Sequence, residues 1–162
     1  MTGSPLEIER KFLVRILPDL TAVPRATIRQ GYVTAPEDRN EVRLREADES
    51  HFLTVKSGEE MVRSEREIAI TAEQFEALWP ETAGQRIEKA GYTGRLAGGE
   101  LYELDIYAGP LTSLITVEIE FSSETNAEDF VPPDWFGEEV TLDKRYRNRA
   151  LAAVGAPMLG SM

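Results

Sequence analysis

Short segments in which charged and apolar residues alternate recur along almost the whole chain. Seven of them are residues 7–15, 26–34, 41–46, 51–57, 62–70, 100–107 and 114–121, and an eighth, 86–96, carries two glycines that weaken a strand. A period of two places successive side chains on opposite faces of an extended strand, whereas a helix would need a period near 3.6. The chain is therefore predicted to consist mainly of half-buried β-strands.

Turn-forming residues separate these segments by short intervals, at 35–38, 48–50, 57–59, 98–99 and 109–110. Strands joined so tightly pair in the antiparallel sense. Helices are predicted at 72–79 behind the N-cap Thr71, at 125–131 before two prolines, and at 144–154 behind Asp143. The expected fold is α+β, a large antiparallel sheet or barrel with a few covering helices.

Composition narrows the classes of function. No repeat or linker divides the 162 residues, so residues 1–162 are expected to form one domain. The formal net charge of -11 argues against nucleic acid or an anionic membrane as the main partner. The absence of cysteine excludes thiolate metal sites and a cysteine nucleophile. Because no apolar run could span a bilayer and the N-terminus is charged, a cytoplasmic protein without a membrane association is expected.

The charges of each predicted strand gather on one face. Glu7, Glu9 and Lys11 share one side, whereas Ile8 and Phe12 share the other. The same division places on charged faces Arg43, Arg45, Lys56, Arg63, Glu65, Glu67, Glu103, Asp105, Glu118 and Glu120. A solvated sheet face would explain this pattern without any function. Like charges at i and i+2 repel one another, however, and need counter-ions.

The two kinds of charge cluster suggest one ligand. Carboxylates are hard oxygen ligands suited to Mg²⁺ or Mn²⁺, and clustered Arg and Lys side chains bind phosphate. If the sheet closes into a barrel with its charged face inward, both sets meet in one cavity. A polyphosphate that carries divalent cations would fit such a cavity.

The order of the motifs resembles the CYTH superfamily, the triphosphate tunnel metalloenzymes. Residues 7–11 (EIERK) are similar to its E-x-E-x-K signature. Arg43-Leu44-Arg45, Lys56, residues 65–67, residues 118–120 and the segment 133–146 resemble the family's later motifs in the same order. The likeness spans nearly the whole chain and favours the short bacterial members. It implies an eight-stranded antiparallel barrel whose tunnel binds a small-molecule triphosphate with Mg²⁺ or Mn²⁺.

The resemblance also implies roles by position. The phosphate ligands would be Arg43, Arg45, Lys56 and Lys89, with Lys144 or Arg145 adding a cation from the C-terminal segment. The metal ligands would be Glu7, Glu9, Glu118 and Glu120, with Glu65, Glu67 and Asp105 as further acidic lining or second-metal ligands. Lys11 is the candidate base, and Tyr32 is either its partner or a packed strand aromatic. Arg147 and Arg149 are expected to face solvent on the last helix.

One position departs from the family pattern. Residues 89–92 read Lys-Ala-Gly-Tyr, where members commonly read Lys-Thr-Arg-Tyr. Gly91 cannot supply the guanidinium expected there, and a charge-assisted hydrogen bond contributes roughly 1.5–3 kcal/mol. Weaker binding of the substrate or a shifted preference is therefore predicted, although the other cations remain.

The leading hypothesis is an inorganic triphosphatase that hydrolyses tripolyphosphate to pyrophosphate and phosphate, because no element that reads a base or a thiazole is evident. A thiamine triphosphatase, a nucleoside triphosphatase and the adenylate cyclase of the same fold stay open. So does a non-catalytic polyphosphate- or nucleotide-binding protein. The family allows a homodimer, but no interface is evident in the sequence.

Overall fold

The computed structural model describes residues 6–59 and 62–157, apart from the side chains of residues 6, 7, 59 and 62. Nine strands dominate it: β1 (Leu6–Val14), β2 (Arg25–Tyr32), β3 (Glu41–Ala47), β4 (Ser50–Glu59), β5 (Val62–Ala69), β6 (Arg86–Arg95), β7 (Leu101–Tyr107), β8 (Ile115–Glu120) and β9 (Phe136–Glu139). The α-helices are α1 (Ala72–Leu78), α2 (Glu124–Asp129) and α3 (Asn148–Val154), and the 3-10 turns are η1 (Trp79–Thr82), η2 (Gly109–Leu111) and η3 (Lys144–Tyr146). Among these elements, no helix has the length and apolar character needed to cross a membrane.

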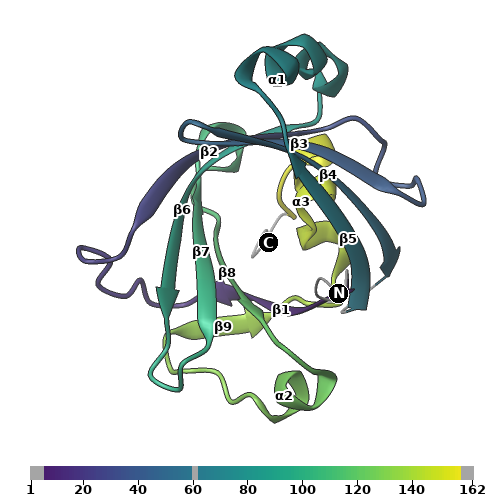
Figure 1. Ribbon diagram of the computed structural model, residues 1–162. Coiled ribbons are helices and arrows are strands. Elements are labelled where there is room, and N and C mark those ends of the chain that lie inside the picture. Colours follow the sequence, from purple (N-terminus) through teal and green to yellow (C-terminus); the bar gives the residue numbers. More distant parts are fainter. Residues whose placement is uncertain (1–5, 60–61, 158–162) are drawn as a thin grey trace.

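The strands form one antiparallel sheet in the order β5-β4-β3-β2-β6-β7-β8-β1-β9. β1 also pairs with β5, from Leu6 opposite Ser64 to Ile8 opposite Val62, so β1 to β8 curl around a central space (Figure 1). The expected antiparallel tunnel fold with a few covering helices is confirmed. The strand β9 was not predicted, because its four residues are too few to show a period.

The sheet is not sealed along its whole length. β1 pairs with β5 near its start, but near its end the same edge pairs with β9, from Phe12 to Val14. The chain after β9 lies beside β1, where the Val140 amide donates to the carbonyl of Lys11 over 2.8 Å. The C-terminal segment 140–154 therefore supplies part of the wall next to the β1–β5 junction.

The predicted helices are present, with one change at the C-terminus. Thr71 caps α1 in a capping box with Gln74, as its residue type suggests. The single helix expected at 144–154 is wrong: Arg147 has an extended backbone (φ -66°, ψ 140°) and divides that segment into η3 and α3. This break changes which side chains of the segment point inward.

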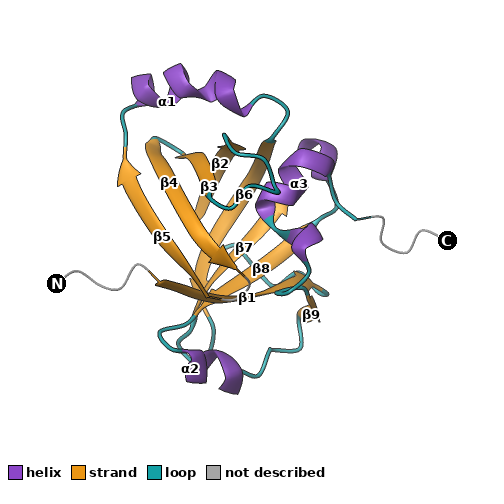
Figure 2. Ribbon diagram, turned by 90° about the vertical axis from the view of Figure 1, so that its right-hand side faces the viewer, coloured by secondary structure: helices purple, strands orange, loops and turns teal. Residues whose placement is uncertain are grey.

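Apolar residues gather mainly on the outer face of the sheet. One buried cluster lies where β1, β7 and β8 meet α2 and β9; it contains Phe12, Leu104, Val117, Ile119, Phe121 and Phe136. A second joins Leu44 to Phe75 and Trp79 around α1. A third includes Tyr32, Ile87, Tyr107 and Leu151 and packs α3 against the strands. Figure 2 shows α1 and α2 on opposite sides of the barrel. α1 and α2 thus shield apolar strand faces on the outside of the barrel, whereas α3 packs on the inner side of β2 and β6.

Candidate active site

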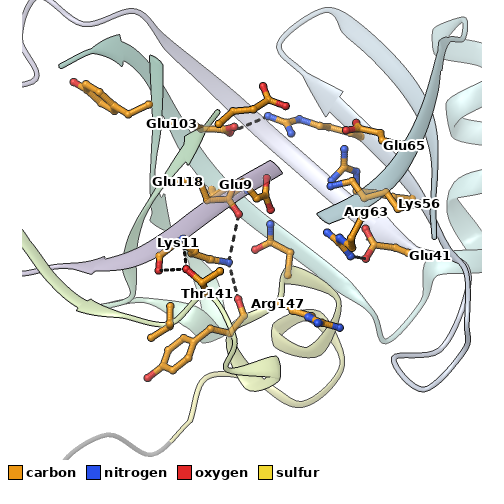
Figure 3. Close-up of a pocket in the computed structure, with 18 of the residues that line it drawn as sticks. Glu9, Lys11, Glu41, Lys56, Arg63, Glu65, Glu103, Glu118, Thr141 and Arg147 are labelled. Atoms are coloured by element: carbon orange, nitrogen blue, oxygen red, sulfur yellow. Dashed lines mark hydrogen bonds and ion pairs between the residues drawn. The ribbon is translucent and has the colours of Figure 1, made fainter. Parts of the chain in front are cut away.

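The charged strand faces line a cavity of about 300 Å³ inside the barrel (Figure 3). Its basic lining comprises Lys11, Arg43, Arg45, Lys56, Arg63, Lys89 and Arg147. Its acidic lining comprises Glu9, Glu41, Glu65, Glu67, Glu103, Glu118, Glu120 and Asp143. Because most of these residues come from alternate positions of the strands, the interpretation of the charges as a merely solvated outer face is wrong.

The basic residues of the wall are unusually buried for cations. Arg43 and Lys56 are 6% exposed and Lys89 is 4% exposed. Burial alone lowers the pKa of Arg43, but Tyr32 and nearby carboxylates outweigh it and raise that pKa above its ordinary value. Its Nη2 lies 3.7 Å from Glu67 Oε1. The guanidinium therefore stays charged although it is almost fully shielded from water.

Carboxylates on β1 and β8 converge because of the register between these strands. Glu9 lies opposite Glu120, and Lys11 lies opposite Glu118. Figure 3 shows Glu9 and Glu118 beside Lys11, with Lys56 and Arg63 across the cavity. The cavity thus has one wall rich in carboxylates and another rich in cations. The side chain of Glu7, a predicted metal ligand, lies outside the described residues.

The donor chemistry of the acidic wall fits a hard divalent cation. Glu9, Glu118 and Glu120 offer carboxylate oxygens to one cavity. Within the described part of the chain, no three acidic or histidine residues already form a complete metal cage. Mg²⁺ in proteins usually keeps several waters and binds through one or two carboxylates together with substrate phosphates. An incomplete carboxylate set that faces a wall of cations is compatible with such binding.

Lys11 occupies the junction between the acidic wall and the C-terminal segment. Its Nζ donates to the backbone carbonyl of Tyr146 over 2.6 Å and lies 3.9 Å from Glu118 Oε2. Burial lowers the pKa of Lys11, and Lys89 acts in the same direction, while Glu118 partly opposes them. Lys11 therefore gives up its proton more readily than an exposed lysine does.

Tyr32 lines the same cavity but belongs to the apolar cluster that packs against α3. Its side chain is fully buried, and its hydroxyl accepts a hydrogen bond from Gln30 Nε2 over 2.5 Å. Burial raises the pKa of this hydroxyl. The geometry therefore matches the packing interpretation of Tyr32, and a partnership with Lys11 stays a prediction.

Two acidic residues of β7 have opposite environments. Burial raises the pKa of Glu103, but Lys89 and Arg45 outweigh it and bring the value to about 2. Arg45 Nη2 donates to Glu103 Oε2 over 3.0 Å. At Asp105 burial prevails and raises the pKa to about 7, although Lys89 opposes it. Asp105 is 1% exposed and is absent from the cavity lining, unlike the other predicted acidic residues that the structure describes.

The cations of the C-terminal segment that lie near the cavity are not the ones that the sequence predicted. Lys144 and Arg145 are exposed and do not line the cavity, and Arg145 is bound to Asp143 Oδ2 at 2.7 Å. Arg147 does line it, and Arg149 is 8% exposed and donates to the Asn40 carbonyl over 3.0 Å. The prediction that the last two arginines face solvent is therefore wrong. A continuous helix was assumed there, but the extended backbone at Arg147 turns these side chains inward.

Three charged strand residues that line the cavity were not among the predicted ligands: Arg63, Glu41 and Glu103. The i, i+2 pattern places each of them on a charged face, Arg63 with Glu65, Glu41 with Arg43 and Glu103 with Asp105. The signal was present, but no family motif singled these residues out. Arg63 Nη1 lies 3.5 Å from Glu41 Oε1, so this pair links β5 to β3 over the inner face of β4.

Comparison with known proteins shows to which family this chain belongs. The sequence profile described as "CYTH domain" matches residues 5–139. The chain belongs to the CYTH family. One relative within it is the inorganic triphosphatase of Nitrosomonas europaea, 55% identical over 148 residues, which cover 90% of this chain and 96% of that protein. Another is the inorganic triphosphatase of Acetivibrio thermocellus, 34% identical over 90% of this chain and 92% of that protein.

Two solved structures agree with the fold. The crystal structure of the inorganic triphosphatase NE1496 aligns with a TM-score of 0.71 and 50% identity, covering 97% of this chain and 99% of that one. A putative adenylyl cyclase from Hippeastrum aligns with a TM-score of 0.55 and 16% identity over 75% of this chain and 82% of that one, which shows a shared fold alone.

Proposed function

We propose that this chain is an inorganic triphosphatase that hydrolyses tripolyphosphate to pyrophosphate and phosphate inside its barrel. The observation that carries the proposal is the single cavity in which buried cations face a carboxylate wall, in a chain 55% identical to an enzyme of that name. Both curated relatives bear this name, so thiamine triphosphate, nucleotides and cyclisation are not favoured as its chemistry.

The basic wall would bind the phosphate oxygens. Arg43 and Arg45 come from β3, Lys56 from β4 and Lys89 from β6, so four cations converge from three strands. Phosphoryl transfer requires mainly positioning and neutralisation of charge. Because these cations are already desolvated and fixed, they would spend little free energy on reorganisation when the substrate enters.

The carboxylates Glu9, Glu118 and Glu120 would hold a divalent cation, Mg²⁺ or Mn²⁺, between themselves and the bound phosphates. Such an ion supplies charge neutralisation and polarises the phosphoryl group. Glu65 and Glu67, which line the facing wall, are the described candidates for a second site.

Lys11 would receive a proton from the attacking water. Its amine lies at the carboxylate wall, and its lowered pKa increases the neutral fraction that can act as a base. The Tyr146 carbonyl, 2.6 Å from Nζ, fixes the direction of the amine.

Phosphate release from tripolyphosphate, ATP and thiamine triphosphate, each with Mg²⁺, Mn²⁺ or EDTA, tests the proposal. We expect metal-dependent release that is strongest on tripolyphosphate and lost in Glu9→Gln. Stabilisation of the fold by tripolyphosphate without any release would instead identify a binding protein. Release that is strongest on ATP or thiamine triphosphate would contradict the proposed substrate.

A further inference from the structure

We propose that Asp105 serves the reaction as a positioning residue that holds the Lys89 ammonium group in the cavity wall, and that it is not a metal ligand. This inference rests on the proposed function, in which Lys89 binds a phosphate oxygen. It reassigns a residue that the family resemblance placed among the acidic lining.

The geometry separates Asp105 from the other carboxylates. Lys89 Nζ donates to Asp105 Oδ2 over 2.7 Å, and each side chain of this pair is 2% exposed. Lys89 lines the cavity, whereas Asp105 does not. A metal ion in the cavity would not meet this carboxylate, because Asp105 is buried outside the cavity lining and one of its oxygens is already bound to the ammonium.

A third group fixes the same lysine. Lys89 lies opposite Tyr107 in the β6–β7 register, and its Nζ is 5.5 Å from the centre of the Tyr107 ring. The ammonium is therefore held between a carboxylate and an aromatic face. Both partners come from β7, two residues apart on its inward face.

Gly91 explains why Lys89 is the cation that β6 offers to Asp105. Gly91 lies directly opposite Asp105, and a Cβ at this position would lie 3.3 Å from Asp105 Oδ1 and 2.7 Å from Ile28 Cδ1. A side chain there would press on the carboxylate and displace Ile28. Because residue 91 is a glycine, the β6 side chain that reaches Asp105 is that of Lys89, two residues before Gly91.

The pairing has a consequence for binding. Asp105 is the carboxylate that the Lys89 ammonium contacts directly, so this contact fixes where the ammonium lies in the cavity wall. Replacement of Asp105 by asparagine keeps the size of the side chain and a hydrogen-bond acceptor but weakens the charge-assisted hydrogen bond that holds the ammonium. Lys89 would then bind a phosphate oxygen less well, while the carboxylates of β1 and β8 would keep their geometry.

Steady-state kinetics of Asp105→Asn with tripolyphosphate test this inference. We expect KM to rise about tenfold, equivalent to about 1.4 kcal/mol, with a smaller change in kcat. The metal concentration for half-maximal rate should stay at the wild-type value, whereas Glu120→Gln should raise it. Asp48→Asn is the matched control, because it makes the same change at an exposed carboxylate that accepts a hydrogen bond from the Thr27 amide over 2.9 Å and does not line the cavity. It should retain the wild-type KM.

A double-mutant cycle with Lys89→Gln asks whether Asp105 acts through that lysine. We expect Asp105→Asn to have no further effect on KM in the Lys89→Gln background. If Asp105→Asn does not fold, the double variant, which buries two neutral amides, still has to match Lys89→Gln. A raised metal requirement in Asp105→Asn, an unchanged KM, or an effect that persists in the double variant would each overturn the proposal.

The proposed function can fail separately. If the wild-type protein releases no phosphate, the same variants are compared by calorimetric titration with tripolyphosphate. A Kd that rises about tenfold in Asp105→Asn, and not in Asp48→Asn, would support the positioning role in a binding protein. An unchanged Kd would reject it.

Discussion

The two faces of β8 are shielded from water to different degrees and have different surroundings. Val117 and Ile119 point outward and are fully buried among Phe12, Phe121 and Phe136. Glu118 and Glu120 point inward and line the charged cavity. One face therefore gains stability from apolar contacts, while the other keeps like charges close together for a ligand that can balance them. This contrast shows that the alternation typical of a half-solvated sheet also occurs in a barrel whose apolar residues face outward and whose charged residues face the interior.

The largest effect is expected from the inward face. Glu118→Gln removes a carboxylate 3.9 Å from Lys11 Nζ and one of three on the proposed metal wall. We expect kcat for tripolyphosphate to fall at least about a hundredfold, because electrostatic stabilisation of a transition state is usually of that size. The melting temperature should not fall. A variant with near-normal turnover at saturating metal would contradict the role of this wall.

The adjacent residue on the outward face should behave in the opposite way. Ile119→Ala creates a cavity in the outer apolar cluster and should lower the free energy of unfolding by about 2–5 kcal/mol. Urea unfolding measures this change. Below the melting transition, KM for tripolyphosphate should stay close to the wild-type value. A large change in KM in the folded protein would show that the two faces are not separable.

The C-terminal segment allows a sharper comparison between two neighbouring cations. Arg147→Gln removes a guanidinium from the cavity wall, and we expect KM for tripolyphosphate to rise about tenfold, since a hydrogen bond to a charged group contributes roughly 1.5–3 kcal/mol. Arg145→Gln is the control, because Arg145 is exposed and bound to Asp143. It should leave KM unchanged. Equal effects in both variants would mean that Arg145 also contributes to substrate binding, as the family resemblance implied.

The smallest effect concerns an outer ion pair. The Arg10 guanidinium donates to Glu139 and lowers the pKa of that carboxyl below its ordinary value of 4.5. Because the pKa of Glu139 is lower in the folded than in the unfolded state, the ionised carboxylate stabilises the fold at pH values above 4.5. This contribution is lost as the pH falls through the folded-state pKa. Glu139→Gln should therefore lower stability by less than about 1 kcal/mol at pH 7. The difference from wild type should shrink on acidification, as urea unfolding at several pH values would show.

The sequence predicted the strands well because each carries its own period of two. It could not predict β9, which is held by pairing with β1 rather than by a pattern of its own. It also could not distinguish the acidic residue behind a lysine from those that face the cavity. Asp105 and Glu103 share one strand face, yet Asp105 is 1% exposed and Glu103 lines the cavity.

By itself, the sequence determined the strand faces, the residue types of the site and the order of the family motifs. These are local properties, since alternation fixes which side chains share a face. Only the tertiary structure decided which face lies inside, which cation the C-terminal segment contributes and which carboxylates reach the cavity. Those choices depend on the pairing of β1 with β5, β8 and β9 and on the backbone break at Arg147. Contacts between residues far apart in the chain set them, and no local pattern records such contacts.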